Sequence, residues 1–170
     1  VVITEIVSEV DFTARQEVKQ AGAEEKANVI RALEPERLAY AAKVVTDYRD
    51  GKLDADIKAT ESGLKYVIHE EGNGPQAEAG QGVIVQYIGQ LAADGSVFDQ
   101  SFGRGEGIPF QLGTGRVIRG WDEGIALLKE GAKATFFIPS ELGYGADGTP
   151  DGSIPADAEL VFYVELEKVQ

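Results

Sequence analysis

The distribution of glycine along the chain constrains its fold more than any other feature. Of the 21 glycines in 170 residues, only Gly22 and Gly51 lie before residue 60, and the other 19 lie after it. Glycine is disfavoured in helix interiors and favoured in tight turns. The sequence therefore predicts a helical region over residues 1–60 and a turn-rich β domain over residues 61–170.

The first region carries two apolar stripes at helical spacing. The first stripe consists of Ile3, Val7, Val10, Ala14, Val18 and Ala21. Pro35, flanked by Glu34 and Glu36, is typical of a first helical turn, so we expect a second helix to begin there. Gly51 is well placed to end this helix. The second stripe consists of Leu38, Ala41, Ala42, Val45 and Tyr48.

Each stripe needs an apolar surface to cover it, because about 60 helical residues bury little surface alone. One alternative is packing on the rest of the same chain, and the other is a homodimer formed through the N-terminal helices. The sequence leaves both open. Residues 50–61 are polar and mixed in charge, and we interpret them as a linker or a fraying helix end.

From Gly63 the apolar pattern changes to a period of two, which is the period of a β-strand. Val83, Val85 and Tyr87 fall on one face of a strand, and Ile84, Gln86 and Ile88 fall on the other. Further strands are expected after the turn at Asp94-Gly95, over Lys133–Ile138, and over residues 160–167. In this last segment alternate residues are apolar, which predicts a strand buried on one face.

One short helix is expected to start at Trp121 and to include Ile125 and Leu128, with Asp122 and Glu123 in its first turn,. An antiparallel sheet covered by one short helix is an α+β arrangement. The predicted fold class is therefore an α+β domain preceded by a helical N-terminal region.

Charge and composition exclude several functions. The formal net charge is -13, and residues 61–170 carry 17 acidic and 7 basic side chains. No clustered Lys and Arg are present for a phosphate backbone, so no nucleic-acid partner is expected. A solvated surface, or the steering of a basic partner, accounts for the acidity. No run approaches the roughly 20 apolar residues of a membrane span, so no transmembrane segment is expected.

Familiar catalytic and cofactor motifs do not fit this sequence. Gly113, Gly115 and Gly120 have the wrong spacing for a dinucleotide loop, and no phosphate-binding Lys-Ser/Thr pair follows them,. Around Asp147 a calcium loop would need a Glu where Ala158 stands. The chain has no Cys and a single His, which has no Ser or Cys nucleophile near it in sequence,. No cofactor and no metal is therefore expected.

Several aromatic residues stand in contexts that are unusual for a plain core. Tyr144 lies between two glycines, and Trp121 lies at a helix start rather than inside an element. Buried aromatics are commonly ordinary core residues, but aromatics in loops and at element ends are typical of binding sites. The set consists of Tyr87, Phe98 with Asp99, Val117 with Ile118, Trp121, Tyr144 and Phe162.

These residues lie in strings that closely resemble the FKBP family of prolyl isomerases. The strings appear in family order and cover nearly all of residues 63–170. They are Val85–Gly89, Asp94–Asp99, Leu112–Trp121, Glu130–Lys133, Ile138–Gly145, and Ile154–Pro155 leading into Leu160–Phe162. The resemblance implies an antiparallel half-barrel sheet of five or six strands, wrapped around the short helix that begins near Trp121.

The resemblance also implies a pocket, whose residues are transferred one by one from the family pattern to the matching positions of this sequence. Trp121 would form its floor beneath a proline ring, the backbone N–H of Ile118 and the hydroxyl of Tyr144 would donate to ligand carbonyls, and Asp99 would sit at the rim near Arg104. The implied catalytic residues are Tyr87, Phe98, Asp99, Trp121, Tyr144 and Phe162; the implied substrate-binding residues are Arg104, Ile108, Val117, Ile118 and Ile154.

Three positions depart from the family pattern. Ile108 stands where an aromatic is usual, Thr149 stands where some members carry His, and Pro155 is followed by Ala156 rather than a second Pro. We expect these changes to affect sequence preference and inhibitor affinity.

The resemblance implies a peptidyl-prolyl cis-trans isomerase that assists protein folding, with proline-containing polypeptides as clients and macrolides of the FK506 and rapamycin type as inhibitors. The alternative is a chaperone module that binds proline-containing segments with little turnover. The N-terminal helices are similar in placement to those of bacterial macrophage infectivity potentiator-type proteins. That analogy implies a homodimer in a bacterial cell envelope, either in the periplasm or attached to the outer membrane, and the cytoplasm is the alternative location.

Overall fold

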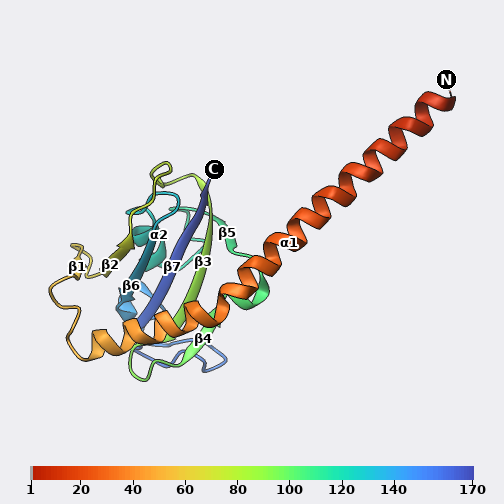
Figure 1. Ribbon diagram of the computed structural model, residues 1–170. Coiled ribbons are helices and arrows are strands. Elements are labelled where there is room, and N and C mark those ends of the chain that lie inside the picture. The colour runs from red at the N-terminus through yellow and green to blue at the C-terminus, as the bar shows by residue number, and fades with distance from the viewer. Residues whose placement is uncertain (1) are drawn as a thin grey trace.

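The computed structural model describes the backbone of residues 2–170 and the side chains of residues 22–170. Its centre is an antiparallel sheet of seven strands in the order β1-β2-β6-β7-β3-β4, with β5 paired to β3. The short helix α2 packs on one face of this sheet, and the long helix α1 crosses the other face (Figure 1). The predicted α+β class and antiparallel half-barrel are confirmed.

The strand count exceeds the expected five or six because a two-residue strand pairs with β2 at the edge of the sheet. The strands are β1 (Lys58–Ala59), β2 (Lys65–Glu70), β3 (Gly82–Leu91), β4 (Val97–Gln100), β5 (Ile108–Gln111), β6 (Lys133–Ile138) and β7 (Leu160–Val169). The helices are α1 (Val2–Arg49) and α2 (Arg119–Ile125), with short 3-10 turns η1 (Phe102–Arg104) and η2 (Ser140–Leu142).

The main core lies between α2 and the inner face of the sheet. Val83, Val85 and Tyr87 point into it from β3, as the period of two predicts. Trp121 and Ile125 enter it from α2, which begins two residues before Trp121. This core positions the functional site, because the aromatic residues singled out in the sequence line its open end.

Helix α1 corrects the prediction of two separate helices. It runs unbroken from Val2 to Arg49, and Pro35 lies inside it rather than in a first turn. Proline removes one helical hydrogen bond and crowds the preceding turn, and the helix changes direction along its length (Figure 1). Ile30 and Leu33 before the proline and Leu38 and Ala41 after it pack in the same cluster. This shared packing outweighs the local preference for a break.

The second half of α1 is covered by its own chain, which is one of the two alternatives that the sequence left open. Val44, Val45 and Ala41 are buried, whereas Ala42, predicted in the stripe, is exposed. The side chains of the first stripe, from Ile3 to Ala21, lie outside the described residues. Intrachain packing therefore accounts for the second stripe. The buried face of the helix is rotated by part of a turn from the face that the sequence predicts.

Strand β7 is buried on both faces, which corrects the prediction of one buried face. Phe162 and Val164 point into the main core, while Val161 and Tyr163 lie under α1. Tyr48 of α1 stacks on Phe137 of β6 with ring centroids 4.1 Å apart. The outer face of the sheet is thus a second apolar core whose cover comes from a distant part of the chain.

A largely buried ion pair fixes α1 on the sheet. Arg37 Nε donates to Glu165 Oε2 at 2.9 Å. Breaking such a pair by removing one partner leaves a charge without compensation. No helix in the described part of the chain combines the length and the hydropathy that crossing a membrane requires.

Replacing Val45 with Ala tests how much the α1 packing stabilises the fold. Val45 is 2% exposed and Val29, on the same helix, is 58% exposed. We expect Val45→Ala to lower the free energy of unfolding by about 2 kcal/mol through lost burial and a cavity. Val29→Ala is the matched control and should change it by less than about 0.5 kcal/mol. Urea unfolding followed by circular dichroism measures both; equal unfolding midpoints would contradict the packing of α1 on the sheet.

Candidate functional site

A cavity of about 210 Å³ opens at the end of the main core. Its walls come from strands β3, β4, β5 and β7, the segment before α2, α2 itself, and the loop after η2. The lining residues are Tyr87, Phe98, Asp99, Ile108, Arg116, Val117, Ile118, Trp121, Tyr144 and Phe162. The cavity thus combines aromatic and aliphatic walls with a few polar groups, which is typical of a small-molecule or peptide site.

Trp121 forms part of the buried wall. It is 4% exposed and lies in the first turn of α2, where its backbone N–H donates to the Ile118 carbonyl at 3.0 Å. Its ring meets those of Tyr87 and Phe162 edge to face, with centroids 5.1 and 5.3 Å away. Edge-to-face contacts of this kind fix ring orientation. Within residues 22–170 the indole Nε1 has no hydrogen-bond partner.

A glycine makes room for the aromatic wall formed by Phe98 and Phe162. Gly89 of β3 pairs with Phe162 on one side and with Asp99 on the other. A Cβ atom at Gly89 would lie 2.7 Å from both the Phe98 and the Phe162 ring. Any larger residue there would therefore displace the two rings that line the cavity.

Three side chains form a hydrogen-bonded polar rim. The Tyr87 hydroxyl donates to Asp99 Oδ2 at 2.5 Å and accepts from Arg104 Nη2 at 2.8 Å. Arg104 Nη1 also donates to Asp99 Oδ1 at 3.2 Å. Burial, together with the hydrogen bond to Asp99, raises the pKa of Tyr87 to about 12, so the phenol keeps its proton at neutral pH.

Helix α1 contacts the segment that carries Arg104. Arg31 Nη2 donates to the Arg104 carbonyl at 3.3 Å, and Gln100 Nε2 donates to Glu34 Oε1 at 3.0 Å. Phe102 is buried in the cluster beneath the helix. A Cβ atom at Gly105 would lie 2.9 Å from the Ala27 carbonyl oxygen. The rim is therefore supported by α1 as well as by the sheet.

The loop before α2 presents Val117 and Ile118 to the cavity. Asp122 holds this loop, because its carboxylate accepts from the Gly113 N–H at 2.9 Å and from the Gly115 N–H at 3.1 Å. Its neighbour Glu123 accepts from the Ser62 hydroxyl at 2.5 Å. Asp122 therefore holds the loop before α2, and Glu123 ties α2 to the segment before β2. In residues 22–170 the Ile118 N–H has no hydrogen-bond partner and is available to a ligand.

Tyr144 lines the cavity from the loop after η2 and is 41% exposed. Burial raises the pKa of its phenol, with a further contribution from the charge of Asp99. Its loop is anchored on both sides, since the Gly145 N–H donates to the Ser140 carbonyl and the Asp157 N–H donates to the Gly145 carbonyl. Among the described side chains its hydroxyl has no partner.

The structure brings together all the predicted site residues except two. Arg104 lies in the polar rim, outside the lining, bonded to Tyr87 and Asp99. Ile154 is buried in the main core, and its N–H donates to the Thr149 hydroxyl at 3.0 Å, so it shapes the loop instead of lining the cavity. Sequence reasoning missed Arg116, which does line the cavity; its place between Gly115 and Val117 was the available signal. Ile108 leaves one wall aliphatic, as predicted.

A larger cavity of about 490 Å³ lies on the outer side of the sheet, beside α1. It contains His69, whose Nε2 lies 2.6 Å from the Thr135 hydroxyl and whose pKa is lowered by burial. The neighbouring charges are paired, with Lys133 bonded to Glu70 at 3.3 Å. The smaller aromatic cavity is the better candidate despite its size, because it lies at the open end of the main core and its walls are mainly apolar. No metal-binding cluster of His, Cys, Asp and Glu occurs in the described part of the chain.

Comparison with known proteins identifies relatives of the β domain. A family model described as FKBP-type peptidyl-prolyl cis-trans isomerase matches residues 74–167. FK506-binding protein 1B of Neurospora crassa is 45% identical over 114 residues, which are 64% of this chain and 99% of that protein. The crystal structure of AtFKBP13 superimposes with a TM-score of 0.63 at 36% identity, covering 67% of this chain and 98% of that one.

Bacterial relatives are longer than the matched region. The FKBP-type peptidyl-prolyl cis-trans isomerase FkpA of Aeromonas hydrophila is 47% identical over 114 residues, which are 67% of this chain and 41% of that protein. The chain therefore matches less than half of the length of that relative.

Replacing Asp99 with Asn tests the polar rim through the titration of Tyr87. The negative charge of Asp99 and the hydrogen bond it accepts both raise the pKa of the Tyr87 phenol. Asp99→Asn should therefore move the pKa of Tyr87 downward from about 12, and Tyr87 should lose its proton at lower pH than in the unchanged protein. NMR titration of ¹³C-labelled tyrosine measures this, with Tyr87→Phe to assign the signal. An unchanged Tyr87 titration would contradict the rim geometry.

Proposed function

The chain belongs to the FKBP-type peptidyl-prolyl cis-trans isomerase family, and on that premise we propose that it isomerises X–Pro bonds in the aromatic cavity beside Trp121. The observation that carries this proposal is the cavity itself. Its walls are mainly apolar, and its polar groups are few and fixed. A volume of about 210 Å³ suits a proline ring, with the flanking peptide lying across the mouth.

The chemistry needs no nucleophile and no proton transfer. Twisting an amide breaks its resonance, which gives a barrier of about 18–20 kcal/mol. The planar amide has the larger charge separation, so water stabilises it more than the twisted state. A dry aromatic cavity removes that advantage, and groups that hold the flanking chain favour the twisted geometry. Each 1.4 kcal/mol or so removed from the barrier raises the rate about tenfold.

Each part of the cavity has a proposed role. Trp121 supports the face of the proline ring, while Phe98 and Phe162 exclude water from its edges. The Ile118 N–H, which has no partner among the described residues, donates to a substrate carbonyl. The half-exposed Tyr144 hydroxyl donates to a second carbonyl from the opposite wall. These two donors hold the chain on either side of the bond that turns.

Asp99 is proposed to act from the rim on the reacting amide. Arg104 and Tyr87 hold its carboxylate in one orientation through bonds of 3.2 and 2.5 Å. A fixed carboxylate at the cavity edge can interact differently with the planar and the twisted amide, which is the condition for catalysis.

The substrates are proposed to be proline-containing segments of folding polypeptides, because X–Pro isomerisation takes tens to hundreds of seconds without a catalyst. Macrolides of the FK506 and rapamycin type are proposed to bind the same cavity as inhibitors. This proposal is supported by the family match and by the FK506-binding relative from Neurospora crassa.

Substitutions at Phe98 and Asp99 test the assigned site. We expect Phe98→Ala to lower kcat/KM by about tenfold or more, because it opens the cavity to water and removes a binding contact. Asp99→Ala should lower mainly kcat. The measurement is an isomerisation assay on a chromogenic tetrapeptide with Leu before proline. Val97→Ala is the matched control, because Val97 lies on the same strand, is 44% exposed and does not line the cavity.

The outcomes separate the two readings of the cavity. Full activity of Asp99→Ala would contradict the proposed role of Asp99. Full activity of Phe98→Ala would show that isomerisation does not take place in this cavity. Peptide binding without any acceleration by the unchanged protein would instead favour a chaperone module that holds proline-containing segments.

The N-terminal half of α1 is proposed to form a homodimer. Its backbone is helical from Val2 onward, and it projects away from the β domain (Figure 1). The stripe from Ile3 to Ala21 would supply the apolar contact face,. A dimer of this kind would place two isomerase cavities on one long helical support.

Sedimentation velocity tests the dimer. We expect the unchanged chain to sediment with twice the monomer mass and the double variant Val7→Glu with Val10→Glu to sediment as a monomer, because charges on the stripe oppose helix association. Ser8→Glu adds charge beside the stripe and is the matched control, which should remain dimeric. Monomeric behaviour of the unchanged chain would contradict the proposal.

A further inference from the structure

Two arginines, Arg104 and Arg116, lie near the cavity, and they differ in whether their charge is paired. Arg104 is committed to Asp99 and Tyr87. Arg116 lines the cavity, is exposed, and makes no hydrogen bond or ion pair with any residue whose side chain is described. Asp99 is the one acidic residue in the lining, and Arg104 already neutralises it. The charge left without a partner at the cavity is therefore the positive charge of Arg116.

We propose that Arg116 makes the enzyme favour substrates with an acidic side chain immediately before or immediately after the proline. This inference rests on the proposed function, because it assumes that the peptide lies across the cavity between Ile118 and Tyr144. The ligand group is a carboxylate, which a guanidinium recognises through paired N–H donors.

The backbone of Arg116 is held in place, which makes a contact with the substrate reproducible. The loop on its N-terminal side is tied to Asp122 through the Gly113 and Gly115 N–H groups. On its C-terminal side, Val117 and Ile118 are themselves part of the wall. Ile118, whose N–H is proposed to bind a substrate carbonyl, lies only two residues away. A peptide held there places its flanking side chains within reach of the guanidinium.

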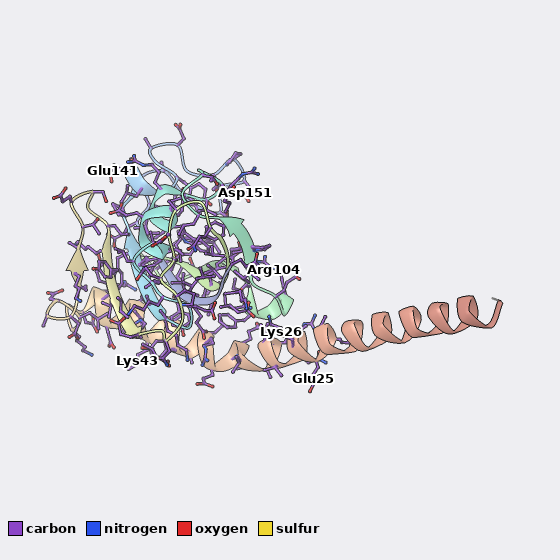
Figure 2. The ribbon with its side chains drawn as sticks, turned by 90° about the horizontal axis from the view of Figure 1, so that it is seen from above. Glu25, Lys26, Lys43, Arg104, Glu141 and Asp151 are labelled. Atoms are coloured by element: carbon purple, nitrogen blue, oxygen red, sulfur yellow. The ribbon has the colours of Figure 1, made fainter. Side chains whose placement is uncertain are left out.

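The net charge of the chain, -13, acts against this preference at long range. Residues 139–160 alone carry five acidic and no basic side chains: Glu141, Asp147, Asp151, Asp157 and Glu159. Glu141 and Asp151 lie at the edge of the domain away from α1, whereas Arg104 lies nearer to α1 (Figure 2). At physiological salt, charges separated by more than about 8 Å are largely screened. For a residue next to the proline, a direct contact with Arg116, the one basic residue among the described lining residues, therefore sets the preference.

An exposed ion pair of this kind corresponds to about a two- to fivefold change in kcat/KM. The part of the preference that depends on Arg116, taken as the difference between the unchanged protein and Arg116→Gln, should rise as salt is lowered, because screening of an exposed pair weakens. It should also be local: the exposed Arg119, three residues further on, does not line the cavity and should not contribute to it.

The test uses the full chain and tetrapeptides that carry Glu, Gln or Lys immediately before or immediately after proline, with the Leu-Pro peptide as reference. The measured quantity is the ratio of kcat/KM for Glu and Gln peptides. We expect a Glu/Gln ratio of about two to five at one of the two positions in the unchanged protein. Arg116→Gln should bring that ratio to about one, and Arg116→Glu should invert it and favour Lys.

Arg119→Gln is the matched control, because it removes the same charge from a neighbouring exposed position outside the cavity. It should leave the Glu/Gln ratio as it is in the unchanged protein. A ratio near one at both positions in the unchanged protein overturns the inference. Equal losses in Arg116→Gln and Arg119→Gln also overturn it, because the effect would then come from net charge alone.

The reference peptide separates failure of this inference from failure of the proposed function. If the unchanged protein accelerates isomerisation of the Leu-Pro peptide and the Glu/Gln ratio does not depend on Arg116, only the substrate preference is wrong. If the Leu-Pro peptide is not accelerated at all, the proposed function fails, and the inference fails with it.

Discussion

Strand β7 sets the arrangement of the whole molecule because both of its faces are buried. Its inner face, with Phe162 and Val164, completes the core around α2, while its outer face, with Val161 and Tyr163, lies under α1. A strand with apolar residues on both faces requires a cover on each side. Helix α1 provides the outer cover, and the Arg37–Glu165 pair fixes it at 2.9 Å. The helix is therefore part of the fold of the β domain.

The same helix reaches the aromatic cavity through the segment between β4 and β5. Glu34 accepts from Gln100 at 3.0 Å, and Phe102 is buried beneath the helix. Arg104 then bonds the Tyr87 hydroxyl at 2.8 Å. A displacement of α1 would shift the guanidinium that orients the Asp99 carboxylate. The packing of α1 on the sheet and the geometry of the polar rim are thus linked, and the link is the short 3-10 turn η1.

Sequence patterns predicted those parts of the fold that depend on local alternation and on motif order. The strand Lys133–Ile138 and the helix at Trp121 follow from such patterns. Patterns could not show that Pro35 lies inside a helix, because packing on both sides of the proline decides it. They could not show that Tyr163 is buried, since its cover lies more than one hundred residues away. Arg116 was missed for a different reason: a charged residue next to a glycine is ordinarily a solvated loop residue, and only the folded loop shows that it lines the cavity.

The two explanations for the apolar stripes are compatible because they use different halves of α1. Packing on the sheet occupies the apolar face of residues 30–48, so that face is unavailable to a second chain. The half before Gly22 extends beyond the domain (Figure 1). The second half is fixed to the sheet. The direction of the first half relative to the domain can therefore change only through bending of the helix. Two chains joined through that half would hold their cavities at a defined separation, because no flexible linker stands between the contact and the site.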